Sequence, residues 1–180
     1  MKISYNYNSI TYGQLITKEE ANTEPNVEYT AYPDTLYTLL IYDPDAVTDT
    51  HNFIHWLVVN INGEKIDEGK HLLSYTGPNP PPNSGLHHYK FELFTQPAVI
   101  PIDDSIERTI PMSELYKKLN LTKENKRDSF LFKVQSQTGG RKRKTKKRKY
   151  KTKYRFTKKD RLHKKNYFTN KKLILFKRKK

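Results

Sequence analysis

Residues 53–61 of the chain, Phe-Ile-His-Trp-Leu-Val-Val-Asn-Ile, decide the fold class. Apart from His55 and Asn60, every residue in this stretch is apolar, and many are β-branched or aromatic. A short run of this composition, bounded by polar residues, is typical of a strand buried on both faces. We therefore predict a central strand, in which alternation puts His55 on the same face as Leu57 and Val59.

Further strands are expected on both sides of this stretch. Six segments alternate polar and apolar residues or are rich in β-branched and aromatic side chains: Ile3–Tyr7, Ile10–Leu15, Val27–Ala31, Leu36–Tyr42, His87–Phe94 and Ser129–Gln135. In contrast, Met112–Leu119 has helical spacing, with Ser113 as the expected N-cap after Pro111. The proline-rich segment 76–85 fits neither a helix nor a central strand. The sequence predicts one mainly β domain with few short helices.

Charge divides the chain into two parts. Of the 34 Lys and Arg residues, 22 lie between Gly139 and Lys180, where Asp160 is the only acidic residue. This tail carries a formal charge of +21, and the preceding residues carry −6, within a total of +15. Small, flexible residues join the two parts. We predict a domain at 1–138 and a Lys/Arg-rich tail at 139–180 that is disordered or partly helical.

Composition also excludes several kinds of site and several locations. The chain has no cysteine, so a disulfide framework, a thiolate zinc site and a cysteine nucleophile are excluded. No run approaches the roughly 20 apolar residues of a membrane span, and the first residues lack the apolar stretch of a secretory signal. We expect a cytoplasmic protein, with the nucleus or a virion as alternatives, and neither a secreted nor a transmembrane one. No cofactor is expected.

Three titratable side chains lie on strand faces that are otherwise apolar. Asp43 stands at the end of one predicted strand, and His55 and His87 point to the apolar faces of two others. Burying such groups is costly unless they are paired. If they converge, Asp43 orients one imidazole and leaves its other ring nitrogen as a donor to an anion. Backbone N–H groups of Ser84-Gly85-Leu86 then complete a site for a phosphate-like or sulfate-like group.

Each of these residues alone has a plainer explanation. A single buried histidine is more often a hydrogen-bonded core residue than a ligand. An Asp-Pro-Asp sequence after a strand is more often only a turn. The anion site is therefore a prediction about the three residues together.

Four sequence blocks follow one another along the chain. They are Tyr37–Ala46 with Asp-Pro-Asp-Ala, His55–Asn60 with His-Trp-Leu-Val-Val-Asn, Gly77–Pro81, and Gly85–Tyr89 with Gly-Leu-His-His-Tyr. In this combination they resemble the signature of the phosphatidylethanolamine-binding proteins, a family that includes the Raf kinase inhibitor proteins. The resemblance covers about residues 3–137, and the basic tail suggests a viral or other divergent member.

The resemblance implies a fold and a site. The fold is a large central antiparallel sheet packed on a smaller sheet, with few helices. In the family, the residues that match Asp43, His55 and His87 line a pocket for phosphate, acetate or the phosphoryl head group of phosphatidylethanolamine. By the same matching, the pocket rim or wall is formed by Tyr89, Pro81 and Tyr75, with Gly85 in the adjoining turn. Most members are regulatory binding proteins rather than enzymes, and a protein kinase or another regulatory protein is the implied partner.

Two departures concern the surroundings of this pocket. His88 stands where the family usually has arginine, which removes a permanent charge and a bidentate donor. Some members close the pocket with a tyrosine on a C-terminal helix, and no residue of the tail matches it. The resemblance therefore implies an anion pocket whose surroundings are altered.

The tail has polyanions as its natural partners. Segment 141–180 is too charged to bury, and its Lys and Arg residues release counterions when they bind nucleic acid. Five aromatic residues are available to stack on unpaired bases: Tyr150, Tyr154, Phe156, Tyr167 and Phe168. A nuclear-localisation signal, an anionic-membrane anchor and a plain solvated tail are the alternatives.

The leading hypothesis is a non-enzymatic binding or regulatory protein whose pocket takes a phospholipid head group or a phospho-residue. A hydrolase is the alternative, either with a metal held by the same three residues or with Ser84 as nucleophile and a histidine as base. Against it, the sequence has no HxH, HExxH or GxSxG motif. A nucleic-acid-binding protein that acts through its tail is the third hypothesis.

Overall fold

The computed structural model describes residues 1–48, 51–102 and 105–137, and in these ranges it consists mainly of two β-sheets. The small sheet has the order β2-β1-β4, and the large sheet has the order β3-β9-β8-β5-β6-β7. The strands are β1 Lys2–Tyr5, β2 Asn8–Ile10, β3 Leu15–Ile16, β4 Asn26–Glu28, β5 Leu36–Thr48, β6 His51–Asn62, β7 Lys70–Leu73, β8 Leu86–Gln96 and β9 Lys126–Gln135. The helices are a 3₁₀ turn, Ile66–Glu68, and α1, Met112–Lys118.

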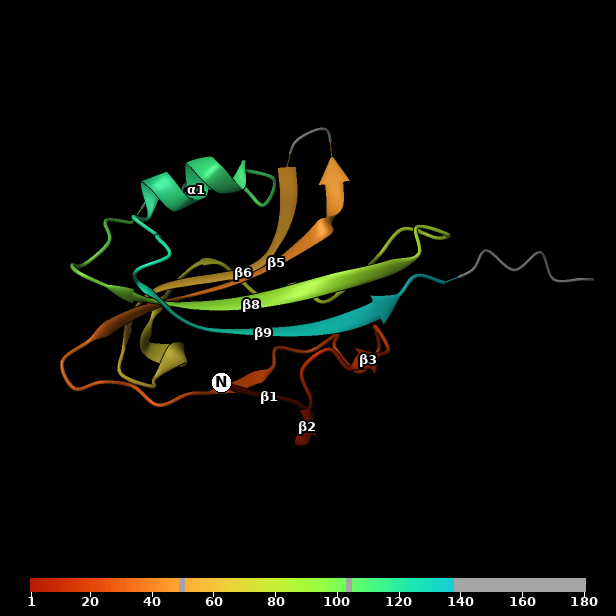
Figure 1. The fold of residues 1–180 in the computed structure, drawn as a ribbon, viewed down its shortest axis with the longest axis horizontal. Coiled ribbons are helices and arrows are strands. Elements are labelled where there is room, and N and C mark those ends of the chain that lie inside the picture. The colour runs from red at the N-terminus through yellow and green to blue at the C-terminus, as the bar shows by residue number, and fades with distance from the viewer. Residues whose placement is uncertain (49–50, 103–104, 138–180) are drawn as a thin grey trace, which may run out of the picture. The chain divides into compact units, whose positions relative to one another are not determined.

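The large sheet is the middle of three layers, with the small sheet on one face and α1 on the other (Figure 1). One core cluster joins the small sheet to the large one and includes Ile3, Val27, Leu39 and Phe91. The second cluster lies under α1 and includes Leu115. Because both faces of β5 and β6 are covered, their sequences are apolar on both faces, whereas β8 carries His88, Lys90 and Glu92 on one face. The predicted class, a mainly β domain with a large and a small sheet, is confirmed.

The predicted strand at Ile10–Leu15 is wrong. Ile10 ends β2 and Leu15 begins β3, and the residues between them form a turn in which Gly13 has a φ of 76°. The Gln14 side chain accepts a hydrogen bond of 2.8 Å from the Thr11 N–H. The segment thus has the composition of a strand, but its glycine and this local hydrogen bond favour a turn.

The predicted helix is confirmed, but its predicted N-cap is wrong. Helix α1 begins at Met112, and Pro111 is its N-cap. The Pro111 carbonyl accepts hydrogen bonds from the N–H groups of Glu114 and Leu115. A proline at this position loses nothing, because its missing N–H has no partner within the helix. Ser113 therefore lies inside the first turn and makes no cap.

A β-bulge in β6 corrects the predicted faces of this strand. Ile41 pairs with Trp56, but the next residue of β5 pairs with Ile54, so His55 is an extra residue on β6. The alternation is reset here, and Leu57 and Val59 pack in the cluster under α1. Since His55 contacts Tyr89 of the other cluster, it does not share their face. Bulges of this kind redirect a side chain, often next to a site.

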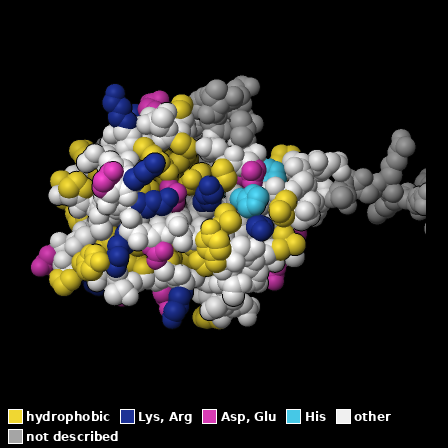
Figure 2. Space-filling model, in the orientation of Figure 1, with side chains coloured by type: hydrophobic (Ala, Val, Ile, Leu, Met, Phe, Trp, Pro, Cys, Tyr) yellow, Lys and Arg dark blue, Asp and Glu magenta, His cyan; other side chains and the backbone are white. Residues whose placement is uncertain are grey.

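The surface of the described part is mixed. On the face drawn in Figure 2, basic, acidic and hydrophobic side chains are interspersed. Among the described residues, no helix is long and apolar enough to cross a membrane. The predicted tail and the proposed boundary at residue 138 lie outside the described residues.

Candidate anion-binding site

The site begins with a buried hydrogen bond between side chains of two central strands. Asp43 of β5 and His87 of β8 are 2% and 3% exposed, and His87 Nδ1 lies 2.7 Å from Asp43 Oδ2. The other carboxylate oxygen, Oδ1, accepts hydrogen bonds from the N–H groups of Asp45 and Ala46 at 2.8 and 3.1 Å. All of these are bonds to the charged form of the carboxyl group. These contacts fix the Asp43 side chain, and Asp43 in turn orients the His87 ring.

His55 reaches the same place from the bulge of β6. Its Nδ1 lies 2.7 Å from the Thr76 carbonyl oxygen, so Nδ1 carries the hydrogen and donates it. This contact leaves Nε2 as the nitrogen that gains or loses a proton. Burial lowers the pKa of His55, the Thr76 carbonyl and the Asp43 carboxylate oppose that shift, and the charges of Arg108 and His87 add to it. The free protein thus favours neutral His55.

Tyr89 connects His55 to Asp43. Its ring makes an edge contact with His55, with centroids 5.0 Å apart, and stacks on Phe132 at 5.1 Å. Burial raises the pKa of the Tyr89 hydroxyl, and a hydrogen bond with the Asp43 carboxylate raises it further. Tyr89 therefore stays a neutral donor in the wall of the site.

The other predicted rim residues have different contacts. Pro81 takes part through its carbonyl, which accepts a hydrogen bond from Ser84 Oγ at 2.6 Å. Gly85 has a φ of 90°, a conformation open to glycine, and its N–H donates to Ser136 Oγ at 2.8 Å. Tyr75 directs its hydroxyl to the Ala21 carbonyl, 2.7 Å away. Its hydroxyl is thus bonded on the small-sheet side.

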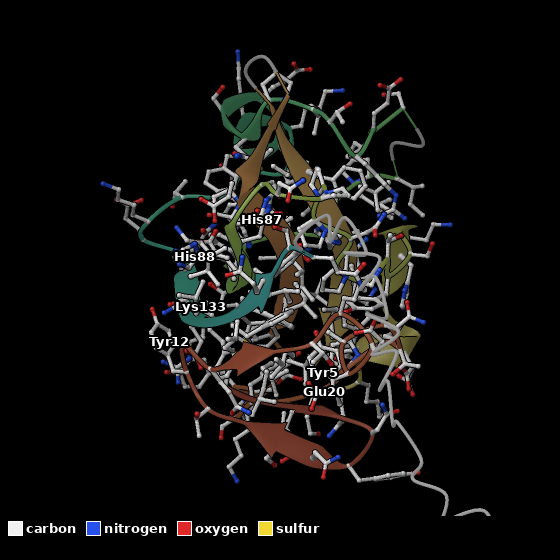
Figure 3. The ribbon with its side chains drawn as sticks, turned by 90° about the vertical axis from the view of Figure 1, so that its right-hand side faces the viewer. Tyr5, Tyr12, Glu20, His87, His88 and Lys133 are labelled. Atoms are coloured by element: carbon white, nitrogen blue, oxygen red, sulfur yellow. The ribbon has the colours of Figure 1, made fainter. Side chains whose placement is uncertain are left out.

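Ser84 adjoins the site through its side chain rather than through the backbone N–H expected from the sequence, which bonds to the Pro81 carbonyl. Ser84 Oγ lies 2.8 Å from His87 Nε2, the nitrogen expected to face an anion. Since Nδ1 bonds to Asp43, both ring nitrogens of His87 have partners within the protein. In Figure 3, His87 and His88 are seen at the end of the large sheet that faces the viewer.

The comparison with known proteins identifies the family. The family model described as phosphatidylethanolamine-binding protein matches residues 6–147. The chain belongs to the phosphatidylethanolamine-binding protein family. The resemblance predicted from the sequence is thereby confirmed.

Relatives of this phosphatidylethanolamine-binding family member come from distant organisms. Putative odorant-binding protein A5 of Drosophila melanogaster is 32% identical over 109 residues, which are 58% of this chain and 52% of that protein. The 26 kDa secreted antigen of Toxocara canis is 34% identical over 92 residues, 49% of this chain and 35% of that protein. The chain thus spans about half or less of the length of these curated relatives.

Solved structures of the family show the same fold. A phosphatidylethanolamine-binding protein from Plasmodium vivax has a TM-score of 0.60 at 17% identity, over 76% of this chain and 84% of that one. The carboxypeptidase Y inhibitor, solved with its cognate proteinase, has a TM-score of 0.57 at 22% identity, over 76% and 82% of the two chains. At these identities the likeness establishes the fold.

Arg108 also adjoins the site, and no pattern in the sequence indicated it. Its guanidinium donates to the carbonyl oxygens of Ile54 and His55, at 2.9 and 3.2 Å, and to that of Ser74 at 2.8 Å. It therefore fixes the bulge and places a positive charge beside His55. Arg108 lies in a loop between elements, where no periodic pattern predicts which strand a side chain reaches.

His88, at the position where the family usually has arginine, forms a second histidine–aspartate pair. His88 Nδ1 lies 2.6 Å from Asp45 Oδ2, and both side chains are more than a third exposed. Asp43 and Asp45 of one strand thus hold His87 and His88 of the next. Within the described ranges, no group of three or more His, Cys, Asp or Glu side chains is arranged to hold a metal ion.

Proposed function

We propose that this chain is a non-enzymatic binding protein whose site of Asp43, His55 and His87 takes a phosphate-sized anion. The ligand carries that anion as a phospholipid head group or a phospho-residue. The observation that carries the proposal is the convergence of three titratable side chains, none more than 5% exposed, from three strands. Buried titratable side chains that gather in one place are typical of a functional site.

Charge balance determines how an anion binds here. Asp43 supplies a fixed negative charge, which repels a second anion at close range. His55 and His87 offset this charge only when they are protonated. Anion binding is therefore coupled to proton uptake.

His55 is the group that takes up this proton. In the free protein, burial lowers its pKa below the ordinary value of 6.5. An anion beside Nε2 favours the charged form and raises that pKa. Affinity is therefore highest at acidic pH and falls as the pH rises through the range in which bound His55 loses its proton.

Calorimetric titration with inorganic phosphate tests the proposal, with phosphoethanolamine and phosphoserine to separate the two ligand sources. We expect affinity at pH 5.5 to exceed that at pH 8 by about tenfold or more, since one unit of pKa coupling is worth a factor of ten. Two buffers of different ionisation enthalpy report the proton uptake.

His55→Gln should remove the pH dependence and most of the affinity. His71→Gln is the matched control, because His71 is a half-buried histidine whose ring contacts Trp56 rather than the site. The proposal is wrong if phosphate binds to His55→Gln and to the unmodified protein with equal affinity.

The names of relatives support a binding role. One is called an odorant-binding protein and another a carboxypeptidase Y inhibitor, and both names describe binding rather than turnover. We extend this to the present chain as a regulatory protein, with a protein kinase among its candidate partners. Polyanion binding by segment 141–180 is proposed from its charge alone.

A further inference from the structure

Ser84, which the proposed function does not use, forms a chain of polar side chains with His87 and Asp43 of the anion site. Ser84 Oγ lies 2.8 Å from His87 Nε2, and His87 Nδ1 lies 2.7 Å from Asp43 Oδ2. Ser84 is exposed, whereas His87 and Asp43 are buried. This order of hydroxyl, imidazole and carboxylate is the one that activates a serine nucleophile.

The hydrogen bonds determine where the protons are. Asp43 is a carboxylate and only accepts, so His87 Nδ1 carries a hydrogen. When His87 is neutral, its Nε2 has a lone pair, and the Ser84 hydroxyl must donate to it. When His87 is protonated, Nε2 donates to Ser84 Oγ, and the hydroxyl turns to the Pro81 carbonyl, 2.6 Å away.

Ser84 can therefore give its proton to His87 only when Nε2 has its lone pair free. The charged groups that face His87 are the carboxylates of Asp43 and Asp45 on β5 and the imidazole of His55 on β6. On β9, the residue opposite His87 is the apolar Val134.

We propose that Ser84 is a nucleophile, with His87 as its base and Asp43 as a positioning residue, for electrophilic phosphoryl esters. Ser84 Oγ attacks phosphorus, an O–P bond forms, and the bond to the leaving group breaks. The hydroxyl proton passes to His87 Nε2, and the leaving group departs with its electron pair. The preference for a phosphoryl over a carboxyl ester rests on the proposed function, because the adjoining site then holds the phosphoryl oxygens.

The surrounding backbone favours a stable covalent adduct on Ser84 over repeated hydrolysis of the ester. The N–H of Ser84 donates to the Pro81 carbonyl at 3.1 Å, and the N–H of Gly85 donates to Ser136 Oγ at 2.8 Å. Both donors next to the nucleophile are thus already used, whereas hydrolases direct such groups at the developing oxyanion. The expected product is a persistent adduct at one site per chain.

Labelling with a fluorophosphonate, read by peptide mass spectrometry, tests the nucleophile in the full chain. We expect Ser84 to be modified at least about tenfold faster than Ser9, an exposed serine on β2, with the rate at pH 8 above that at pH 6. His87→Gln should abolish this advantage, and Asp43→Asn should reduce it. Equal rates at Ser84 and Ser9 would overturn the proposal.

A thiol gives a second readout, because the chain contains no cysteine. A thiolate next to a histidine reacts faster than an isolated thiol. Ser84→Cys should therefore be alkylated by iodoacetamide at pH 7 several-fold faster than Ser9→Cys, and the added change His87→Gln should remove the difference. If the two single variants react alike, His87 does not activate position 84.

Experiments with inorganic phosphate distinguish a failure of this inference from a failure of the proposed function. Calorimetry on the unlabelled protein reports the anion site alone, and labelling reports Ser84 alone. We expect inorganic phosphate to slow labelling of Ser84. Unchanged labelling in a protein that binds phosphate would overturn the preference for phosphoryl esters. Labelling of a protein that binds no phosphate would instead overturn the proposed function and leave the nucleophile.

Discussion

The two aspartates of the Asp-Pro-Asp sequence have unequal roles in stability. Asp43 is 2% exposed and accepts from two backbone N–H groups and from His87. Asp45 is exposed and pairs with His88. Removing a buried partner leaves donors without an acceptor, whereas a surface pair contributes little.

Asp43→Ala should therefore lower the free energy of unfolding by about 3–5 kcal/mol. Asp45→Ala, the matched control from the same motif, should lower it by about 1 kcal/mol or less. Urea denaturation measures both. Equal losses would contradict the structural role assigned to Asp43.

His55 makes stability depend on pH. Its pKa is lower in the folded protein than the ordinary value of 6.5, because burial disfavours the charged form. The unfolded chain therefore binds this proton more readily, and the free energy of unfolding falls as the pH drops below about 6.5. Urea denaturation at pH 7.5 and 5.5 should show a larger loss for the unmodified protein than for His55→Gln. Adding phosphate should reduce the loss, and a variant that is equally sensitive to acid would contradict this assignment.

At the scale of elements, the sequence predicted the strands better than the β-bulge that interrupts β6. The apolar run of residues 53–61 predicted a central strand correctly, because composition reflects burial on both faces. The bulge at His55 depends on pairing with β5 and on Arg108, which is distant in sequence. Local patterns contain no information of that kind. Asp43 and His87 were placed correctly because alternation holds along β5 and β8 up to these residues.

Helix α1 is attached to the large sheet by a buried polar contact. Tyr116 donates to Glu92 Oε2 at 2.5 Å, and Lys126 pairs with the other carboxylate oxygen. Burial raises the pKa of Tyr116, so its hydroxyl stays a donor. Glu92 is only 5% exposed. The buried carboxylate therefore depends on its partners, which are Tyr116, Lys126 and Tyr42.

Tyr116→Phe should lower the free energy of unfolding by about 1–3 kcal/mol, because it removes one donor from a buried carboxylate. Tyr12→Phe is the control, since Tyr12 is 68% exposed, and we expect a change within about 0.5 kcal/mol. Thermal or urea unfolding measures the difference. A loss no greater than that of the control would show that the hydroxyl contact is not needed.

At the scale of the whole molecule, charge separates the two proposed functions. The domain and the tail have formal charges of −6 and +21, so only the tail is suited to polyanions. Composition alone located this boundary, which stays a prediction because residues 138–180 lie outside the described part. The cytoplasmic location likewise stays a prediction, and one relative is named as a secreted antigen.

Deleting residues 139–180 should abolish binding to single-stranded nucleic acid. The full chain should lose affinity by more than about tenfold between roughly 50 and 200 mM salt, because binding releases counterions. Fluorescence polarisation with a labelled oligonucleotide measures both effects. Undiminished binding by the truncated chain would assign the nucleic-acid site to the domain.

The pairing of β3 with β9 joins Leu15 to Lys133, so it closes a very long loop. Bringing together residues so distant in sequence costs chain entropy, so such contacts form late in folding. The amide hydrogens of Gly13 and Lys133, which bond across this pair, should therefore exchange with solvent before those between β5 and β8. Ser136, just beyond this pair, holds Gly85 beside Ser84. When this edge opens locally, Gly85 loses its contact with Ser136. The rate of that opening therefore determines how long the turn at Ser84-Gly85 keeps its conformation between two encounters with a ligand.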